Sequence, residues 1–474
     1  MNFQSFHFIL FLVTLVVACG LLWRNFAARK NLLLLASYYF YMCWDWRFAG
    51  LLIATTLLHY VVAIRLAQAT DLRVRRAWLL VSVVGALGVL AYFKYANFFL
   101  QSAVSLANVL GLEAHAAVLQ VVLPIGISFY TFQALSYVLD VYRREQEPTR
   151  DLRDFALFVG FFATVLAGPI TRASELLSQF EKQQTVPGPD VERALALVAQ
   201  GFIKKIIFAD VLAAQIVDPA FANPGAYSPL FLLVAVYAFS FQIYMDVSGY
   251  TDIARGSALL CGFRLPPNFD RPYLARSVSN FWQRWHMSMS GFFRNYVFIG
   301  LGGSRYGNVY LNLMLTFLAI GLWHGGGWNF LLYGALHGSM VCLERLLRRR
   351  KPAQAPGEGV QEGSALVTFL QIALVFQFVA FTRILFRAHD LDAAARYLQA
   401  MFQFGHGVAP FSVLSLALLA AAALLHWGIP SARLVALDRL RRIPVPLQAV
   451  ALVTVVYVCM AFSAGKPNFV YFLF

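Results

Sequence analysis

The stretch VYLNLMLTFLAIGLWHGGGWNFLLYGALHGSMVCLE, residues 309–344, is mostly apolar but carries two histidines, His324 and His337, in its second half. An ionisable side chain at membrane depth costs free energy unless it is partnered, and it usually serves a function. Three glycines, residues 325–327, follow His324 directly. Glycines weaken a helix and let other groups approach its backbone closely. We therefore predict a helix break after His324 and proton-transfer chemistry in a cavity beside it.

The composition predicts an all-α, polytopic membrane protein. Of the 474 residues, 60% are hydrophobic and 13% are charged, whereas soluble domains carry about 25% charged residues. A spanning helix needs about 20 apolar residues, which predicts about 11 to 13 spans, some short enough to be tilted or re-entrant. The apolar runs are 5–23, 31–46, 48–67, 78–99, 116–142, 154–172, 192–217, 227–248, 309–324, 328–344, 364–388, 411–429 and 446–464.

The net charge of +15 is placed as the positive-inside rule expects, in short loops between apolar runs. The basic clusters are 24–30, 73–76, 345–351 and 433–442. No basic domain stands apart from the spans, so we do not expect nucleic-acid binding. Because the first run is followed by positive residues, we expect a multi-pass protein of a bacterial inner membrane with its N-terminus and Phe474 on the periplasmic side.

We expect one membrane domain over residues 1–474. Its predicted parts are N-terminal helices 1–240, a catalytic core 241–344, a cytoplasmic linker 345–363 and C-terminal helices 364–474. The five cysteines are scattered and form no CxxC or Cys/His cluster, so neither a metal site nor a disulfide framework is predicted.

The least hydrophobic part of the chain, residues 241–308, gathers most of the intramembrane charge. Intramembrane carboxylates usually pair. Asp252 lies three residues before Arg255, which predicts a local ion pair, while Asp246 is left open between structure and catalysis. From 281 to 301, aromatic residues interleave with Arg and His, which favours a re-entrant or interfacial element. Non-helical backbone at that depth lines protein or watery cavities, so we expect a central funnel or tunnel.

Several motifs, in order along nearly the whole chain, resemble the membrane-bound O-acyltransferase (MBOAT) family. The resemblance is strongest to the branch that holds the membrane subunit of alginate O-acetylation and the peptidoglycan O-acetyltransferase. The motifs are FKYANFF (93–99), LPIGISFYTFQALSYVLDVYR (123–143), LAGPITR (166–172), GFIKKIIFAD (201–210), FQIYMDVSGYTDIARG (241–256), GFRLPPNFDRPYLARSVSNFWQRWHMSMSGFFRNYVFIGLGG (262–303), GLWHGGGWNFLLYGALHG (321–338) and Phe386-Arg387-Ala388.

The resemblance implies an acyltransferase whose catalytic histidine, in the WHG motif, is His324, with a second polar position at His286 in the RWH element. It implies acetyl-CoA as a donor substrate on the cytoplasmic side, with no tightly bound cofactor. It also implies a periplasmic partner with a serine-hydrolase-like (SGNH-type) domain and a polysaccharide acceptor. Met245 and Val247 stand where the branch pattern has Phe, and both exchanges stay apolar.

Acetyl transfer from a thioester to a hydroxyl needs a base, and histidine titrates near cellular pH, so we assign His324 that role. The developing oxyanion needs hydrogen-bond donors. The loop amides at 325–327, Asn329 and His286 are alternatives that the sequence leaves open. Further candidates for acceptor or oxyanion contacts are Trp323, Asp246 and His337, and candidates for the donor phosphates are Arg284, Arg294 and Arg305.

The predicted function is a membrane O-acetyltransferase that moves acetyl from the cytoplasmic donor across the membrane, for an exported polysaccharide or cell-wall glycan. One alternative is a transporter of an acetyl carrier or glycan precursor with a buried His/Asp proton relay, although such transporters commonly show internal repeats and this chain shows none. Another is a metal-dependent hydrolase using His286, His324 and His337, although no HExxH motif is present.

Overall fold

The computed structural model describes residues 3, 5–115, 118–182, 188–349, 364–405, 407–428 and 443–462. Three sequence predictions fall wholly or mostly outside these ranges: the cytoplasmic linker 345–363 beyond residue 349, the basic cluster 433–442, and the position of Phe474.

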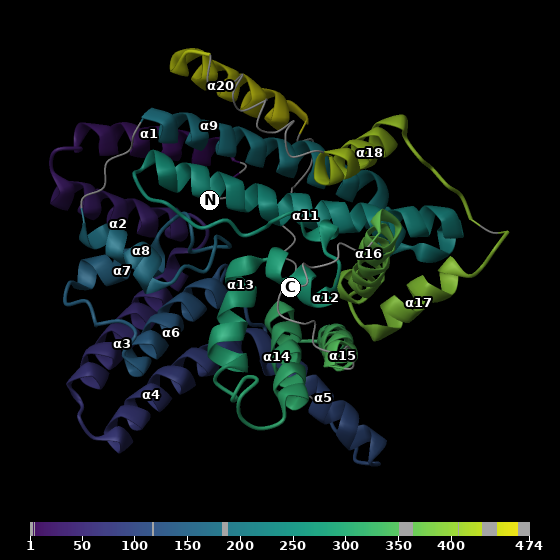
Figure 1. Ribbon diagram of the computed structural model, residues 1–474, viewed down its shortest axis with the longest axis horizontal. Coiled ribbons are helices and arrows are strands. Elements are labelled where there is room, and N and C mark those ends of the chain that lie inside the picture. The colour runs from purple at the N-terminus through teal and green to yellow at the C-terminus, as the bar shows by residue number, and fades with distance from the viewer. Residues whose placement is uncertain are drawn as a thin grey trace. The chain divides into compact units, whose positions relative to one another are not determined.

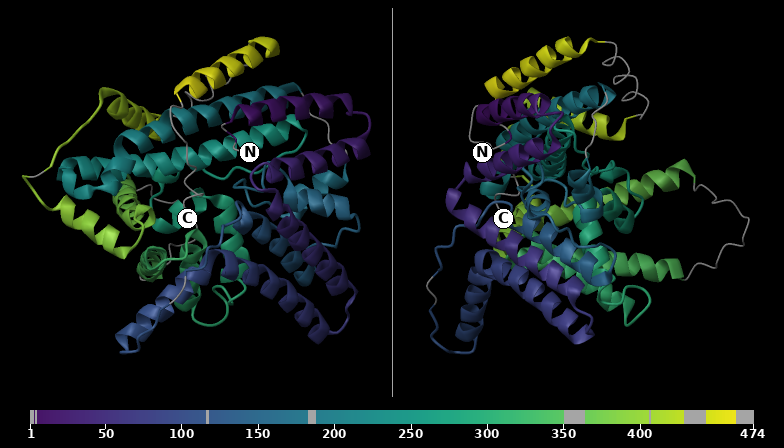
Figure 2. Two further views of the ribbon diagram at one scale, coloured as in Figure 1. Left: turned by 180° about the vertical axis from the view of Figure 1, so that it is seen from behind. Right: turned by 90° about the vertical axis from the view of Figure 1, so that its left-hand side faces the viewer.

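The described residues are helical and contain no strand; β-pairing within them is limited to an isolated bridge between Tyr227 and Val408. Figures 1 and 2 show the helices, and the predicted all-α class is confirmed. The α-helices are α1 (Phe6–Leu21), α2 (Phe26–Met42), α3 (Ala49–Gln68), α4 (Leu72–Leu90), α5 (Ala96–Val109), α6 (Ile127–Arg143), α7 (Leu152–Gly160), α8 (Ala173–Glu181), α9 (Gly188–Phe202), α10 (Asp218–Ala222), α11 (Pro229–Leu260), α12 (Val278–Arg284), α13 (Met287–Phe292), α14 (Val309–His324), α15 (Trp328–Arg349), α16 (Ala365–Arg387), α17 (Leu391–Met401), α18 (Val413–Trp427) and α20 (Val445–Phe462).

Short 3-10 and π segments join or interrupt these helices. The 3-10 turns are η1 (Trp46–Phe48), η5 (Pro224–Ala226) and η6 (Pro272–Leu274). The π segments are η2 (Ala91–Tyr95), η3 (Ile203–Asp210), η4 (Ala213–Val217) and η7 (Phe293–Phe298). Within helices, π segments often mark functional positions.

Five helices among the described residues are long and apolar enough to cross a membrane: Trp46–Gln68, Leu72–Val109, Pro229–Leu260, Trp328–Leu347 and Ala365–Arg387. Shorter apolar helices include Phe6–Leu21, Val309–His324 and Val413–Trp427. The structure therefore agrees with a multi-pass membrane protein, while the count of about 11 to 13 spans stays a prediction.

Several predicted spans have different bounds in the structure; the run 116–142, for example, is helical only from Ile127. The run 154–172 is helical only to Gly160, and residues 161–171 are buried non-helical backbone. Its hydrophobicity reflects burial inside the protein, which composition cannot distinguish from contact with lipid. The run 227–248 continues as helix α11 to Leu260, and Asp252 and Arg255 in this extension form the predicted pair at 3.7 Å.

The contacts divide the chain into two compact units. Unit 1 comprises Met1–Gly201 and Tyr250–Pro266, and unit 2 comprises Phe202–Gly249 and Pro267–Phe474. In unit 1, helix α3 packs against α4 and α6, as Figures 1 and 2 show for α3 and α4. In unit 2, α14 packs along α15, and α12 lies against both α15 and α16. The candidate site residues all belong to unit 2.

Two glycines allow α14 and α15 to approach each other. A Cβ atom at Gly321 would lie 2.2 Å from the Phe330 carbonyl oxygen, and one at Gly334 would lie 2.4 Å from the Phe317 carbonyl oxygen. Small residues at helix crossings permit such close backbone packing in membranes. The predicted break is confirmed, since α14 ends at His324 and α15 begins at Trp328.

Candidate active site

His324 is the last residue of α14, and its side chain is held among aromatic rings. It is 3% exposed. Its ring centroid lies 4.8 Å from that of Trp323, 4.9 Å from that of Phe386 on α16, and 6.1 Å from that of Tyr333 on α15. Three helices thus bring their side chains to one imidazole, in surroundings that keep most water away.

His286 occupies the sharp turn between α12 and α13, outside the five spanning helices. Its φ of +44° lies in the left-handed region, which is uncommon for a residue with a Cβ. Asn268 holds the turn, because its carbonyl accepts from Met287 N at 2.9 Å and its Oδ1 accepts from Ser288 N at 3.0 Å. His286 is fully buried, and burial lowers its pKa to about 3, so its imidazole is neutral at cellular pH.

The Trp323 indole brings the two histidines into one site. Its ring centroid is 5.6 Å from that of His286 and 4.8 Å from that of His324, with edge-to-face geometry at both. Trp323 is 3% exposed, so its contacts with both imidazoles are shielded from solvent. The structure therefore places the WHG and RWH motifs together, although 38 positions separate the two histidines in the sequence.

His337 lies on α15, and both of its ring nitrogens take part in hydrogen bonds. Trp282 Nε1 donates to His337 Nδ1 at 3.2 Å, and His337 Nε2 lies 3.0 Å from Thr382 Oγ1. The Thr382 hydroxyl donates to the Val379 carbonyl at 2.9 Å, so we assign the His337 proton to Nε2. This is a neutral imidazole whose donor and acceptor are both in use. The acceptor or oxyanion role considered for His337 stays a prediction.

Asn329 joins α15 to the end of α16. Its amide nitrogen donates to the carbonyls of Leu385 at 3.1 Å and Ala388 at 3.0 Å. Phe386, which contacts His324, lies between these two acceptors in the sequence. Asn329 therefore positions a ring of the His324 environment, and its predicted oxyanion role is untested by these contacts.

Asp246 belongs to a buried ion-pair cluster within unit 2. Lys205 Nζ lies 2.8 Å from Asp246 Oδ1 and 2.7 Å from Asp210 Oδ1. The side chains of Lys205 and Asp246 are 4% and 1% exposed. Lys205 and Asp210 both lie in the π segment η3. Asp246 is thus paired, as an intramembrane carboxylate is expected to be.

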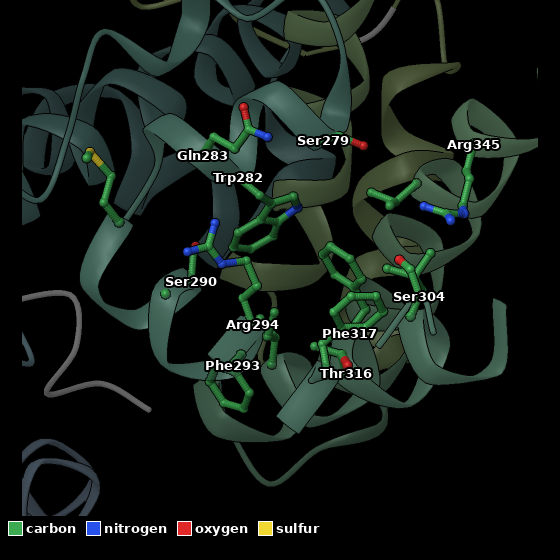
Figure 3. Close-up of a pocket in the computed structure, with 16 residues that line it drawn as sticks. Ser279, Trp282, Gln283, Ser290, Phe293, Arg294, Ser304, Thr316, Phe317 and Arg345 are labelled. Atoms are coloured by element: carbon green, nitrogen blue, oxygen red, sulfur yellow. The ribbon is translucent and has the colours of Figure 1, made fainter. Parts of the chain in front are cut away.

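A cavity of about 750 Å³ opens beside α14 in unit 2. Figure 3 shows Trp282 and Phe317 among the side chains that line it, with Arg294 and Arg345 on opposite sides of the two rings. A smaller polar cavity of about 560 Å³ shares Ser279 and Gln283 with the first. It is lined by residues that include Arg276 and Arg284.

The three arginines proposed for phosphate binding have different surroundings. Arg294 lines the large cavity, whereas Arg284 lines the small one and pairs loosely with Asp270 at 3.4 Å. Arg305 is exposed and is not among the residues that line either cavity. Arg345 was assigned only to a basic loop cluster, yet it lines the large cavity. Its Nε is buried without a hydrogen-bond partner in the described part of the chain.

Sequence reasoning missed the residues that complete the site through long-range contact. Trp282, Tyr333 and Phe386 are aromatic residues in an aromatic-rich chain, so nothing in their local sequence marks them. Lys205 had a signal, since it lies in the motif GFIKKIIFAD, but its partner is 41 positions away. Among the described residues, no three His, Cys, Asp or Glu side chains gather as a metal site would require.

The arrangement suits transfer chemistry that needs a proton acceptor inside the protein. His286 is neutral at cellular pH, and His324 lies beside it, across Trp323, in a site with little water. A positioned imidazole takes a proton from a hydroxyl efficiently, and electrostatic interactions are stronger where water is excluded.

Comparison of this sequence with known proteins identifies a family whose name matches the transfer chemistry that the site suits. The model of the membrane-bound O-acyltransferase family matches residues 143–381. The chain is 41% identical over 391 residues to the "Probable alginate O-acetylase AlgI" of Azotobacter vinelandii, covering 81% of this chain and 75% of that protein. It is 32% identical over 406 residues to the "Peptidoglycan O-acetyltransferase" of Helicobacter pylori, covering 80% and 74%.

The protein is therefore a membrane-embedded, multi-pass acyltransferase. It belongs to the membrane-bound O-acyltransferase family. The match with the "Teichoic acid D-alanyltransferase" of Streptococcus thermophilus is weaker, at 29% identity over 48% of this chain.

Proposed function

We propose that this chain transfers acetyl from acetyl-CoA to a hydroxyl, for O-acetylation of an exported polysaccharide or cell-wall glycan. The names of its relatives, an alginate O-acetylase and a peptidoglycan O-acetyltransferase, support this class of acceptor. The observation that carries the proposal is that α14 lines the large cavity as far as Ile320, one turn before His324 at the end of the same helix.

One face of α14 lines that cavity. Leu313, Phe317 and Ile320 all contribute to the lining and recur at helical spacing. The next position on the same face, four residues after Ile320, is His324. A donor whose thioester arm lies along this face has its acyl end directed at the imidazole.

The two cavities fit the two chemical parts of a coenzyme A thioester. The large cavity, lined by rings and aliphatic side chains, suits the pantetheine arm and acyl group. The arginines at its sides and in the polar cavity suit the phosphates, because a guanidinium forks to phosphate oxygens. Arg294 and Arg345 in the large cavity and Arg276 and Arg284 in the small one are the groups we assign to them.

In the proposed reaction, His324 takes the proton of the acceptor hydroxyl while its oxygen attacks the thioester carbonyl carbon. The C–S bond then breaks, acetyl stays on the acceptor oxygen, and the coenzyme A thiolate leaves with the proton from His324. We assign His286, a neutral ring in contact with Trp323, the role of donating a hydrogen bond to the carbonyl oxygen as charge develops.

The proposal places the protein in a bacterial inner membrane, with donor entry from the cytoplasm and both termini in the periplasm. The basic residues at the C-terminal end of α15, beginning at Arg345, support a cytoplasmic side for that helix end. A periplasmic SGNH-type partner would complete delivery to the polysaccharide, as the resemblance implies.

The test uses purified protein in lipid nanodiscs with acetyl-labelled acetyl-CoA and an oligosaccharide acceptor. We expect release of free coenzyme A and label on the acceptor. His324→Ala should lower the rate by about 10²- to 10⁴-fold, the usual contribution of a general base. His115→Ala, which changes an exposed histidine in unit 1, is the matched control and should retain the wild-type rate.

Wild-type transfer from His324→Ala at equal protein level would refute the assignment of the base. Uptake of label into vesicles without release of coenzyme A would refute transfer chemistry and favour transport instead.

A further inference from the structure

The Trp282 indole forms part of the wall of the large cavity, and it also packs against His337. It lines the cavity and is 6% exposed. Its ring centroid lies 5.6 Å from that of Phe317 on α14 and 5.3 Å from that of His337 on α15. His337 in turn contacts Tyr333 at 4.5 Å, and Tyr333 contacts His324. Ring contacts through His337 and Tyr333 thus connect the cavity wall at Trp282 with the surroundings of His324.

A hydrogen-bonded chain fixes the orientation of this wall. The indole N–H donates to His337 Nδ1, the other nitrogen of His337 meets Thr382, and the Thr382 hydroxyl donates to the Val379 carbonyl. His337 is fully buried, and Thr382 is 6% exposed. Rotating the indole would leave a buried ring nitrogen of His337 without its donor, which costs about 1 to 3 kcal/mol.

Helix α12, which carries Trp282, is fixed at a second point. The Glu344 carboxylate accepts from Val278 N and from both the backbone and the hydroxyl of Ser279. Glu344 lies seven residues after His337, two turns along the same face of α15. Helix α15 therefore holds α12 at its first turn and at Trp282, so the wall has little freedom to retreat.

We infer that Trp282, locked by His337 and Thr382, sets the length of the acyl group that this enzyme accepts and restricts it to short chains. The inference rests on the proposed function, in which the acyl end of the donor lies in this cavity beside Ile320, one turn before His324. A longer chain at that end would have to displace a ring that is pinned by hydrogen bonds and packed against Phe317. Well-packed aromatic walls tolerate added methylenes poorly.

The test compares acetyl-, butyryl- and hexanoyl-CoA as donors for wild type and Trp282→Leu in nanodiscs. We expect wild type to prefer acetyl. Trp282→Leu should raise the hexanoyl-to-acetyl ratio of kcat/KM by about tenfold or more, since each methylene in an apolar pocket changes discrimination about 10- to 200-fold. His337→Phe removes the acceptor of the indole N–H and should move the ratio in the same direction, by less.

Phe281→Leu is the matched control. Phe281 precedes Trp282, is 1% exposed and is not among the residues lining the cavity, so its loss should leave the ratio unchanged. Binding of acetyl-, butyryl- and hexanoyl-pantetheine, measured by thermal stabilisation of the protein, gives a readout that does not depend on turnover.

The outcomes separate the inference from the proposed function. An unchanged length profile in a folded Trp282→Leu protein, in both transfer and binding, overturns the inference. If no coenzyme A thioester is a donor but Trp282→Leu gains affinity for hexanoyl-pantetheine, the donor assignment fails and the role of Trp282 stands. An equal change in the length profile of Phe281→Leu would show a general loosening of α12, and it would also overturn the inference about Trp282.

Discussion

The backbone of His286 is held in a conformation that few side chains tolerate. Its φ of +44° lies in the left-handed region, where Asn is enriched among residues with a Cβ and β-branched residues are outliers. Strained backbone of this kind costs about 1 to 3 kcal/mol and persists where the surroundings impose it. Asn268 supplies that constraint through its contacts with Met287 and Ser288.

Two substitutions at His286 distinguish the role of its backbone conformation from the role of its imidazole ring. We expect His286→Asn to keep the melting temperature near that of wild type while lowering transfer activity, because Asn adopts the turn but lacks the imidazole. His286→Val should lower both, with a stability loss of about 1 to 3 kcal/mol. Thermal unfolding in detergent, together with the acetyl-CoA assay, provides the measurement. Full activity of the Asn variant would show that the imidazole has no part in transfer.

Helices α14 and α15 form the frame on which His324, Tyr333 and His337 are mounted. Their closest approach depends on missing side chains, at Gly321 and Gly334, rather than on side-chain interdigitation. Since α14 both lines the cavity and ends at His324, a shift of this helix moves the cavity wall and His324 together.

Adding one methyl group at this crossing should show how tightly it is packed. Gly321→Ala places a Cβ against the Phe330 carbonyl oxygen, so we expect a loss of about 1 to 3 kcal/mol, the usual cost of overpacking, and reduced activity. Gly88→Ala is the control, because it also lies within a helix but its Cβ would meet nothing within 4 Å. That change should stabilise by about 0.4 to 1 kcal/mol. Equal changes in stability for Gly321→Ala and Gly88→Ala would contradict the close approach of α14 and α15.

At the scale of the molecule, two largely buried ion pairs in the described part of the chain join distant segments, Lys30 with Asp154 and Lys205 with Asp246. Lys205 is the clearest case, with two carboxylates on one ammonium group inside unit 2. Removing one partner of a buried pair leaves an uncompensated charge.

We therefore expect Lys205→Met to destabilise the protein by about 3 to 5 kcal/mol, the usual cost of breaking a buried pair. The double variant Lys205→Met, Asp246→Leu should recover part of this loss, since it removes one of the stranded carboxylates. Thermal unfolding of the solubilised protein measures both. Additive losses in the double variant would mean that Lys205 and Asp246 are not coupled.

Much of this protein follows from local sequence. Long apolar runs predict helices in a membrane, and the glycines at 325–327 predict the break after His324 because they weaken a helix whatever surrounds it. The ordered motifs indicate the family, and with it the two histidines to examine. Hydrophobicity failed at 154–172, where a buried non-helical segment is as apolar as a span.

Other features arise from contacts between segments far apart in the chain. The partner of Asp246, the tautomer of His337 and the wall formed by Trp282 each depend on atoms 41 to 55 positions away. Periodicity and composition describe which face of a helix is apolar, but not which neighbour that face meets. Hydrogen bonds and cavities depend on that choice of neighbour, so the packing of the helices alone determines how the site is closed and which groups are available in it.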